Sequence, residues 1–301
     1  MDWILASIAS AVGFAGVGIL DKIVIEKHSP SPRTFMIFVG VLQLPGSLIP
    51  MAFVGFEPYS VINILIACGS GLLIGVSLLL MFMALRKQDA SVVAAVYQTA
   101  PVFVAIIAVI FLKEHLTFFQ WLAILLTVVG AVLISLKRTG VGFGFGSLGV
   151  WFFVMIAASV FFGAGLTLTK VALNEMSFWN VFAYRGIGTA IPLMFLPGTR
   201  NTFKESLLFI KNLKGLSIVV FSEAILAFAA LWFTTIAIDN SPVSLATAIM
   251  STRPLFAVIF GAVLSLRYLR ILDEPLDRGS ITQRSFAVVM IVVGVSGISL
   301  L

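Results

Sequence analysis

Two stretches of the sequence, 153 positions apart, decide the fold: residues 91–103, SVVAAVYQTAPVF, and residues 244–256, SLATAIMSTRPLF. In both stretches the first, fifth, ninth, eleventh and thirteenth residues are serine, alanine, threonine, proline and phenylalanine. The two prolines, Pro101 and Pro254, lie inside long apolar runs, where a helix loses one backbone hydrogen bond and bends. The match predicts an internal repeat with a kinked helix at the same place in each copy.

The composition predicts that most of the chain faces lipid. Of the 301 residues, 60% are hydrophobic and only 11% are charged, and the mean hydropathy is +1.13. A soluble domain carries roughly 25% charged residues, so this chain cannot build a water-facing surface of its size. The net charge of +6 sits in short clusters between apolar runs, as at a cytoplasmic membrane face, which argues against nucleic-acid binding. One cysteine and two distant histidines predict no disulfide, no metal site and no cofactor.

Apolar runs long enough to cross a bilayer, which takes about 20 helical residues, recur along the whole chain. They are Trp3–Val24, Thr34–Phe53, Ser60–Leu85, Ala90–Leu112, Phe118–Leu136, Leu148–Val171, Phe178–Leu196, Leu216–Ile238, Pro242–Leu266 and Ser285–Leu301. We therefore expect an all-α membrane protein with ten transmembrane helices.

The ten predicted spans assign each loop to one of two sides of the membrane, and most of the basic residues fall on one side. Fifteen of the 19 Lys and Arg residues fall in loops assigned to one side, and Lys113 and Lys170 fall on the other. The remaining two, Arg185 and Arg253, lie within spans. Because cytoplasmic loops are rich in Lys and Arg, this distribution predicts a multi-pass protein of the cell (inner) membrane with both termini outside.

A glycine-rich connector, residues 140–147, divides the chain into residues 1–139 and 148–301. Each half holds five predicted spans. Since five is odd, the second half must cross the membrane in the opposite sense to the first. Inverted repeats of this kind are typical of secondary transporters, whose substrate site lies near the bilayer midplane between the halves.

The first half also carries an ordered set of motif residues between positions 84 and 130. The set is Ala84-Leu85, Ser91, Gln98-Thr-Ala-Pro101, Phe111-Leu-Lys-Glu114-His-Leu-Thr117, Gln120 and Gly130. The second half repeats part of it as Glu274-Pro-Leu, Gln283 and Gly294, and contains an additional charged stretch, Arg267–Asp277, that the first half lacks. This pattern resembles the EamA repeat of the drug/metabolite transporter superfamily, most closely over residues 84–136.

The resemblance implies a ten-helix fold in which helices one to four and six to nine surround a central cavity, with helices five and ten at the periphery. It also implies export or exchange of small metabolites, amino acids prominent among them. Such relatives are usually drawn with both termini in the cytoplasm. The Lys and Arg distribution of this chain predicts the reverse orientation.

Three charged residues well away from the ends of the spans are candidate substrate-site residues: Arg253, Glu223 and Arg185. A charge at the bilayer centre costs about 2.5–3.5 kcal/mol on insertion scales, so such side chains face protein or water. Arg253 directly precedes Pro254, and its guanidinium could hold a substrate carboxylate or phosphate; an ion pair with Glu223 is the alternative. Glu223 is either the proton acceptor of coupled transport or a lock between the eighth and ninth spans. Arg185, beside Gly186, is either an inward anchor or a substrate contact.

Neutral polar and aromatic residues complete the candidate substrate site. They are Tyr97, Gln98, Thr99, Tyr184, Trp232 and Ser251. The first three lie within one turn before Pro101, and at least one of them must point away from a central cavity, because successive helix positions are 100° apart. We expect charge on the second half of the site, hydrogen-bonding groups on the first, and hinges at Pro101 and Pro254.

These features predict a secondary active transporter and not an enzyme. The net charge of +1 among Arg185, Glu223 and Arg253 favours a zwitterion or monoanion, such as an amino acid, over a bare cation. We expect export or exchange by alternating access of the two halves, with protons as the candidate coupling ion. A membrane-embedded enzyme acting on lipid-linked intermediates and a non-transporting scaffold or sensor stay open as alternative functions. The expected partners are a small-molecule substrate and the lipid bilayer, and a homodimer stays open.

Overall fold

The computed structural model describes residues 2–29, 31–85, 87–88, 90–135, 138–139, 142–143, 150–267 and 278–300. Almost all of these residues are helical. A pair of two-residue antiparallel strands, β1 (Arg138–Thr139) and β2 (Gly142–Phe143), follows the first half. Most of the predicted connector and most of the charged stretch Arg267–Asp277 lie outside the described residues.

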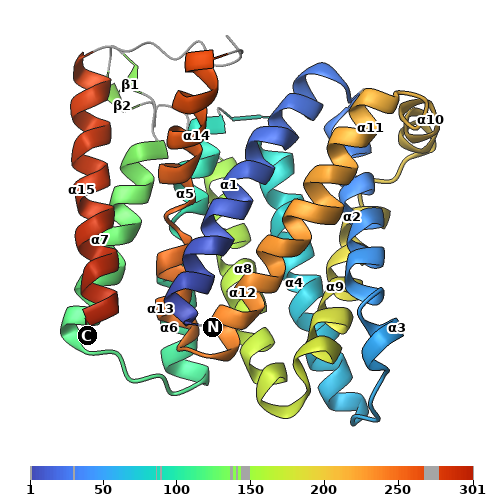
Figure 1. Cartoon of the computed structure of the whole chain (residues 1–301), viewed down its shortest axis with the longest axis horizontal. Coiled ribbons are helices and arrows are strands. Elements are labelled where there is room, and N and C mark those ends of the chain that lie inside the picture. The colour runs from blue at the N-terminus through green and yellow to red at the C-terminus, as the bar shows by residue number, and fades with distance from the viewer. Residues whose placement is uncertain are drawn as a thin grey trace.

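The helices follow the apolar runs and form a bundle (Figure 1). In the first half they are α1 (Trp3–Lys27), α2 (Pro32–Leu48), α3 (Met51–Val54), α4 (Val61–Leu85), α5 (Ala90–Tyr97), α6 (Ala100–Phe111) and α7 (Phe118–Ser135). In the second half they are α8 (Val150–Glu175), α9 (Phe178–Phe195), α10 (Arg200–Phe209), α11 (Leu213–Val219), the π-helix η1 (Val220–Ala227), α12 (Phe228–Asp239), α13 (Val243–Met250), α14 (Arg253–Arg267) and α15 (Arg278–Leu300).

Eight helical segments within the described residues are long and apolar enough to cross a membrane. Two of the ten predicted spans are not among them. The 18-residue helix α9 carries Asn180 and Arg185, which lower its hydropathy, and the apolar part of α15 is the shorter segment Ser285–Ile298. The chain is therefore a multi-pass membrane protein, and the count of ten spans stays a prediction.

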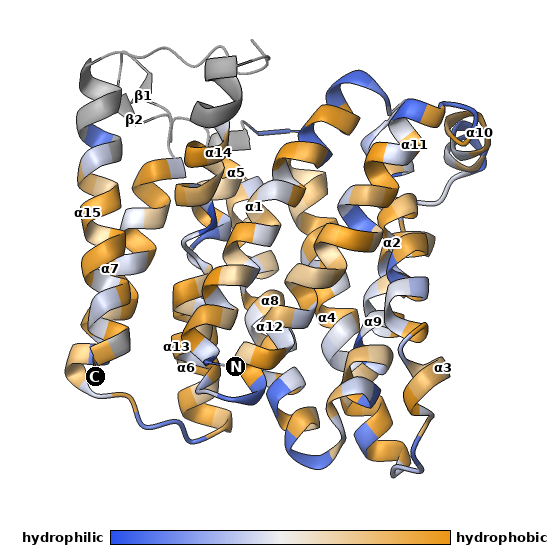
Figure 2. Cartoon of the chain, in the orientation of Figure 1, coloured by the Kyte–Doolittle hydropathy of each residue, from blue (hydrophilic) through white to orange (hydrophobic). Residues whose placement is uncertain are grey.

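The surface around the bundle is apolar, as a lipid solvent requires. Large side chains such as Leu65, Leu122 and Ile225 are exposed by 64%, 52% and 57%. Hydrophilic residues gather toward the two ends of the bundle (Figure 2). Because apolar side chains face outward around the middle, the buried polar residues inside the bundle form a separate group that requires its own explanation.

Helix pairs from different halves pack closely, and glycines allow the approach. Helix α7 packs against α15, α2 against α9, and α6 against α13, while α4 contacts both α8 and α9. On α4, a Cβ atom on Gly71 would overlap the carbonyl oxygen of Arg185 on α9. At the α7–α15 crossing, a Cβ on Gly130 would come within 2.9 Å of the carbonyl oxygen of Ala287. These contacts hold the two halves together as one bundle.

Candidate functional site

Two helical segments of the bundle are interrupted at corresponding positions. Helix α5 ends at Tyr97 and α6 begins at Ala100, while α13 ends at Met250 and α14 begins at Arg253. The intervening residues, 98–99 and 251–252, are separated by the same 153 positions as the two sequence stretches. Because α6 packs against α13, the two interruptions lie in neighbouring segments of the bundle.

Equivalent backbone hydrogen bonds shape both interruptions. From donor to acceptor they are Thr99 N to Val96 O (3.0 Å), Val102 N to Thr99 O (3.0 Å), Thr252 N to Ile249 O (3.1 Å) and Leu255 N to Thr252 O (2.9 Å). These tight turns occur where Pro101 and Pro254 have no N–H to donate. Each following helix therefore begins inside the bundle, with the unpaired N–H groups and partial positive charge of a helix N-terminus.

Arg253 is the first residue of α14 and lies over an aromatic ring of the first half. Its Cζ atom is 4.2 Å from the centroid of Phe14 on α1, which is a close cation–π contact. The Nε atom of Arg253 and the Oγ1 atom of the preceding Thr252 are buried, and neither has a hydrogen-bond partner among the described residues. A buried polar group without a partner costs about 1–3 kcal/mol, so these two groups are available to a polar ligand.

Tyr97 approaches Arg253 from the other interruption. The Ser77 hydroxyl donates to the carbonyl oxygen of Ala158 (2.7 Å), so at 3.2 Å the Tyr97 hydroxyl donates to Ser77 Oγ. Tyr97 lies within electrostatic range of Arg253, and its ring lies 5.5 Å from that of Phe162 on α8. The structure thus brings together the aromatic hydroxyl of one half and the guanidinium of the other.

Two other polar residues of the interruptions form hydrogen bonds within their own turns. The hydroxyl of Thr99 donates to Val96 O, and that of Ser251 donates to Ala248 O, each at 2.6 Å. The side chain of Gln98 is partly buried. Thr99 and Ser251 therefore stabilise the turns, while Gln98 retains a side-chain amide for other contacts.

Arg185 forms a second, separate cationic position. Its side chain is 3% exposed, its Cζ atom is 5.4 Å from the Phe182 ring centroid, and Nη1 is buried without a partner among the described residues. The Phe182 ring packs on Phe228 of α12 at 5.5 Å. The Oγ atom of Ser47, which packs against the adjacent Gly186, is also buried without a partner. Arg185 and Arg253 therefore contact different aromatic rings, on α9 and α1.

Glu223 does not form the alternative ion pair with Arg253. It is 8% exposed in η1, and its carboxyl group lies in hydrogen-bonding contact with that of Asp21 on α1. Ser222 Oγ donates to Asp21 Oδ1 at 2.9 Å. The physical reason is that α1 packs against both η1 and α14, so it presents Asp21 to Glu223 and Phe14 to Arg253.

Asp21 is a site residue that the sequence analysis missed. It lies near the end of the predicted span Trp3–Val24, next to Lys22, where the sequence indicates a side chain in contact with water. The structure continues α1 to Lys27 and leaves the Asp21 side chain half-buried, with its carboxyl group accepting a hydrogen bond from Ser222 of η1. An acidic residue within helical reach of an apolar run was the only signal available in the sequence.

Two predicted aromatic residues make their ring contacts away from this group. The ring of Trp232 lies 5.1 Å from that of Phe233 on its own helix, and the ring of Tyr184 lies 5.8 Å from that of Phe56. Neither contact involves Arg253, Tyr97 or Glu223, so their role in substrate binding stays a prediction.

Two charged residues bind the helix ends at the α12–α13 turn, and one of them, Glu114, comes from the first half. The carboxylate of Glu114 accepts hydrogen bonds from Val243 N (2.7 Å), Ser244 N (3.4 Å) and the Ser244 hydroxyl. Lys170 Nζ donates to the carbonyl oxygens of Ile238 and Asp239, both at 2.8 Å. Glu114 thus caps the N-terminus of α13, and Lys170 caps the C-terminus of α12.

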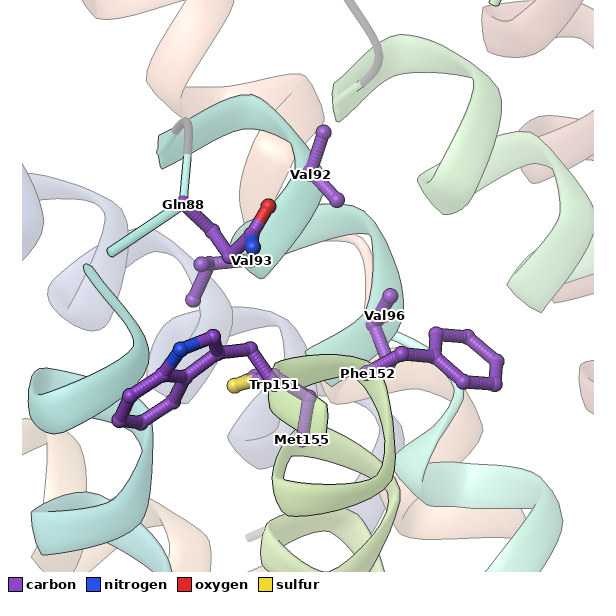
Figure 3. Close-up of a pocket in the computed structure, with 7 residues that line it drawn as sticks. All are labelled: Gln88, Val92, Val93, Val96, Trp151, Phe152 and Met155. Carbon is purple, nitrogen blue, oxygen red and sulfur yellow. The ribbon is translucent and has the colours of Figure 1, made fainter. Parts of the chain in front are cut away.

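A small pocket lies between α5 and α8 (Figure 3). Its lining is Gln88, Val92, Val93, Val96, Trp151, Phe152 and Met155. None of these side chains is charged, and the volume of about 10 Å³ is at the lower limit for one water molecule. The pocket therefore does not suit a charged metabolite.

Comparison with known proteins gives a relative, a similar fold among the solved structures and a family. An uncharacterized protein of Methanocaldococcus jannaschii, MJ1333.1, is 29% identical over 126 residues, which are 42% of this chain and 90% of that protein. A crystal structure of a protein 16% identical in sequence matches the fold with a TM-score of 0.70, over 99% of this chain and 96% of that one. The profile of the EamA-like transporter family matches residues 1–136 and 149–300. The chain therefore belongs to the EamA-like transporter family.

Proposed function

We propose that this chain is a secondary transporter in which two inverted five-helix halves, residues 1–139 and 148–301, alternate access to a site at the helix interruptions. The family profile matches two segments of nearly the same extent. The pairs α7–α15, α2–α9 and α6–α13 join helices at equivalent places in the two halves, as a two-fold relation requires. The shared 153-residue offset of the interruptions agrees with this relation.

The proposed solute is a small zwitterion or monoanion with a carboxylate, such as an amino acid. The observation that carries this choice is the Arg253 guanidinium at an interrupted helix, with unpartnered Nε and Thr252 Oγ1 atoms. Arginine holds carboxylates through two parallel hydrogen bonds, and the N-terminus of α14 adds a partial positive charge. With one proton on the carboxyl pair of Glu223 and Asp21, this pair, Arg185 and Arg253 together carry a net charge of +1, which suits one negative group on the solute.

Counterflow in proteoliposomes tests this assignment. Liposomes are loaded with one unlabelled amino acid, and entry of the same labelled amino acid is measured across a set of amino acids. We expect exchange of at least one. Since a lost hydrogen bond to a charged group costs about 1.5–3 kcal/mol, Arg253→Gln is expected to weaken the apparent affinity for it about 10- to 100-fold. Arg33→Gln, which neutralises an exposed arginine, serves as the matched control and retains exchange. No exchange of any amino acid, or equal affinities for Arg253→Gln and wild type, contradicts the proposal.

We further propose that protons drive transport through the carboxyl pair of Glu223 and Asp21. Two carboxylates in contact repel each other, so the pair holds a proton more readily than either group alone. The pair lies in a π-helical segment, a distortion that often marks functional sites. In Glu223→Gln, we expect uptake to lose its dependence on a pH gradient while counterflow persists. An unchanged dependence on the gradient contradicts the coupling role without affecting the solute assignment.

We propose that both termini face the outside of the cell membrane. Figure 1 places both chain ends toward the same side of the bundle, and the turn from α1 to α2 lies at the opposite side. Lys27 at the end of α1 and Arg33 in the first turn of α2 flank this turn. This arrangement suits an even number of crossings, and the basic loops suit the cytoplasm. Labelling of Asp2→Cys in intact cells, with Cys68→Ser as background, tests it: protection from an impermeant reagent contradicts the orientation.

A further inference from the structure

Helix α10 has no part in the proposed transport site. It connects α9 to α11 and lies across the direction of the other helices at one end of the bundle (Figure 1). One face of α10 is fixed to the protein: Thr202, Ser206 and Phe209 are buried, and the Phe209 ring packs on Phe38 of α2 at 5.0 Å. The helix is therefore held in place and presents its other faces outward.

The single acidic residue of α10, Glu205, binds to another part of the protein. Glu205 Oε2 accepts hydrogen bonds from the hydroxyls of Ser31 (2.6 Å) and Thr34 (3.0 Å), at the first turn of α2. This contact satisfies the carboxylate and places its negative charge at a helix N-terminus. As a result, the outward faces of α10 carry no acidic side chain that could offset nearby basic ones.

The outward faces combine an apolar stripe with a basic one. Phe203 and Leu207 are one turn apart, and their side chains are 52% and 66% exposed. With 100° between successive residues, Arg200 and Lys204 form a stripe next to them, away from the buried face. Lys211 and Lys214 follow in the adjoining segment. All four basic side chains are exposed, and none forms an ion pair or a side-chain hydrogen bond with another described residue.

We propose that this surface of α10, made of Phe203, Leu207, Arg200, Lys204, Lys211 and Lys214, binds the headgroups of anionic phospholipids. The apolar stripe enters the boundary between headgroups and acyl chains, and the adjoining basic stripe meets the phosphate layer. This order of faces is that of an interfacial amphipathic helix, and clusters of four or more basic residues beside a span select anionic lipid. Because Glu205 also binds the start of α2, bound lipid would stabilise the contact between α10 and the bundle.

Fluorescence quenching in nanodiscs tests the proposal on the full-length protein. A bimane label is attached at Leu207→Cys in a Cys68→Ser background, in discs of phosphatidylcholine. Spin-labelled phosphatidylglycerol or spin-labelled phosphatidylcholine is then titrated in. We expect half-maximal quenching at about a tenfold lower fraction of the anionic lipid. Equal quenching by the two lipids, or no quenching by either, overturns the proposal.

Two variants in which basic residues are replaced by glutamine distinguish a lipid site on α10 from attraction of anionic lipid by the positive charge of the whole protein. The combined variant R200Q/K204Q/K211Q/K214Q is expected to lose the preference for phosphatidylglycerol. The matched control K22Q/K27Q/R33Q/K87Q removes the same number of exposed basic residues at the same end of the bundle and is expected to retain it. An equal loss in both variants contradicts the assignment to α10. If the first variant is not monodisperse, K204Q alone is measured, and a preference identical to wild type then counts against the proposal.

Discussion

Replacement of Glu114 should uncouple the two halves of the bundle at one end. Its carboxylate lies in the loop between α6 and α7, yet it accepts hydrogen bonds from the backbone of Val243 and from the backbone and hydroxyl of Ser244, at the start of α13. These are the N–H groups that a helix leaves unpaired at its first turn. We expect Glu114→Gln and Glu114→Ala to destabilise the protein without changing its helix content.

The structure sets the magnitude of this loss. Hydrogen bonds to a charged group contribute about 1.5–3 kcal/mol each, and the 3.4 Å contact with Ser244 N adds little. Since Glu114 is only partly buried, we take the lower value for the two short bonds and expect Glu114→Ala to lower the free energy of unfolding by about 3 kcal/mol. Glu114→Gln keeps one acceptor oxygen, but its amide NH₂ group faces one of the N–H or O–H donors that the carboxylate binds. We therefore expect the free energy of unfolding to fall by about 2 kcal/mol.

Unfolding by sodium dodecyl sulfate in mixed micelles, followed by circular dichroism, measures these free energies. Glu175→Gln, at an exposed carboxylate, is the matched control and is expected to change stability by less than about 0.5 kcal/mol. In a double-mutant cycle, Glu114→Gln and Ser244→Ala should show a coupling energy of about 1 kcal/mol. A Glu114→Gln variant as stable as the control, or no coupling with Ser244, would refute the reasoning.

Two further substitutions test the packing of the bundle. Gly71→Ala places a methyl group on the backbone carbonyl of Arg185, which cannot move away, so we expect the free energy of unfolding to fall by at least about 3 kcal/mol in the same assay. Gly69→Ala is the control: a Cβ there has no atom within 4 Å, so stability should stay the same or rise. Equal stabilities of the two variants contradict the close approach of α4 and α9. Lys170→Met leaves two helix-terminal carbonyls without their donor, and we expect a loss of about 1–2 kcal/mol. The exposed Lys113→Met should not reproduce this loss, and a Lys170→Met variant as stable as wild type argues against the cap.

The two helix interruptions could be predicted from the sequence, because each depends on a proline inside an apolar run. A proline inside an apolar run always removes a backbone donor, so the match between residues 91–103 and 244–256 predicts both interruptions, and the structure has them at these positions. The membrane class follows in the same way from the hydropathy of single helices. The π-helix around Glu223 has no comparable signal, because the backbone there depends on its packing against α1 and α2.

The sequence alone determined that this chain is a helical membrane protein of the EamA type, and where most of its apolar helices and both interruptions lie along it. These are properties of neighbouring residues, and hydropathy, proline and charge report them directly. Only the tertiary structure decided which groups meet: Asp21 with Glu223, Arg253 with Phe14 and Tyr97, and Glu114 with the start of α13. Such pairs join residues more than a hundred positions apart, and their distance is set by the way helices pack, which no local pattern records.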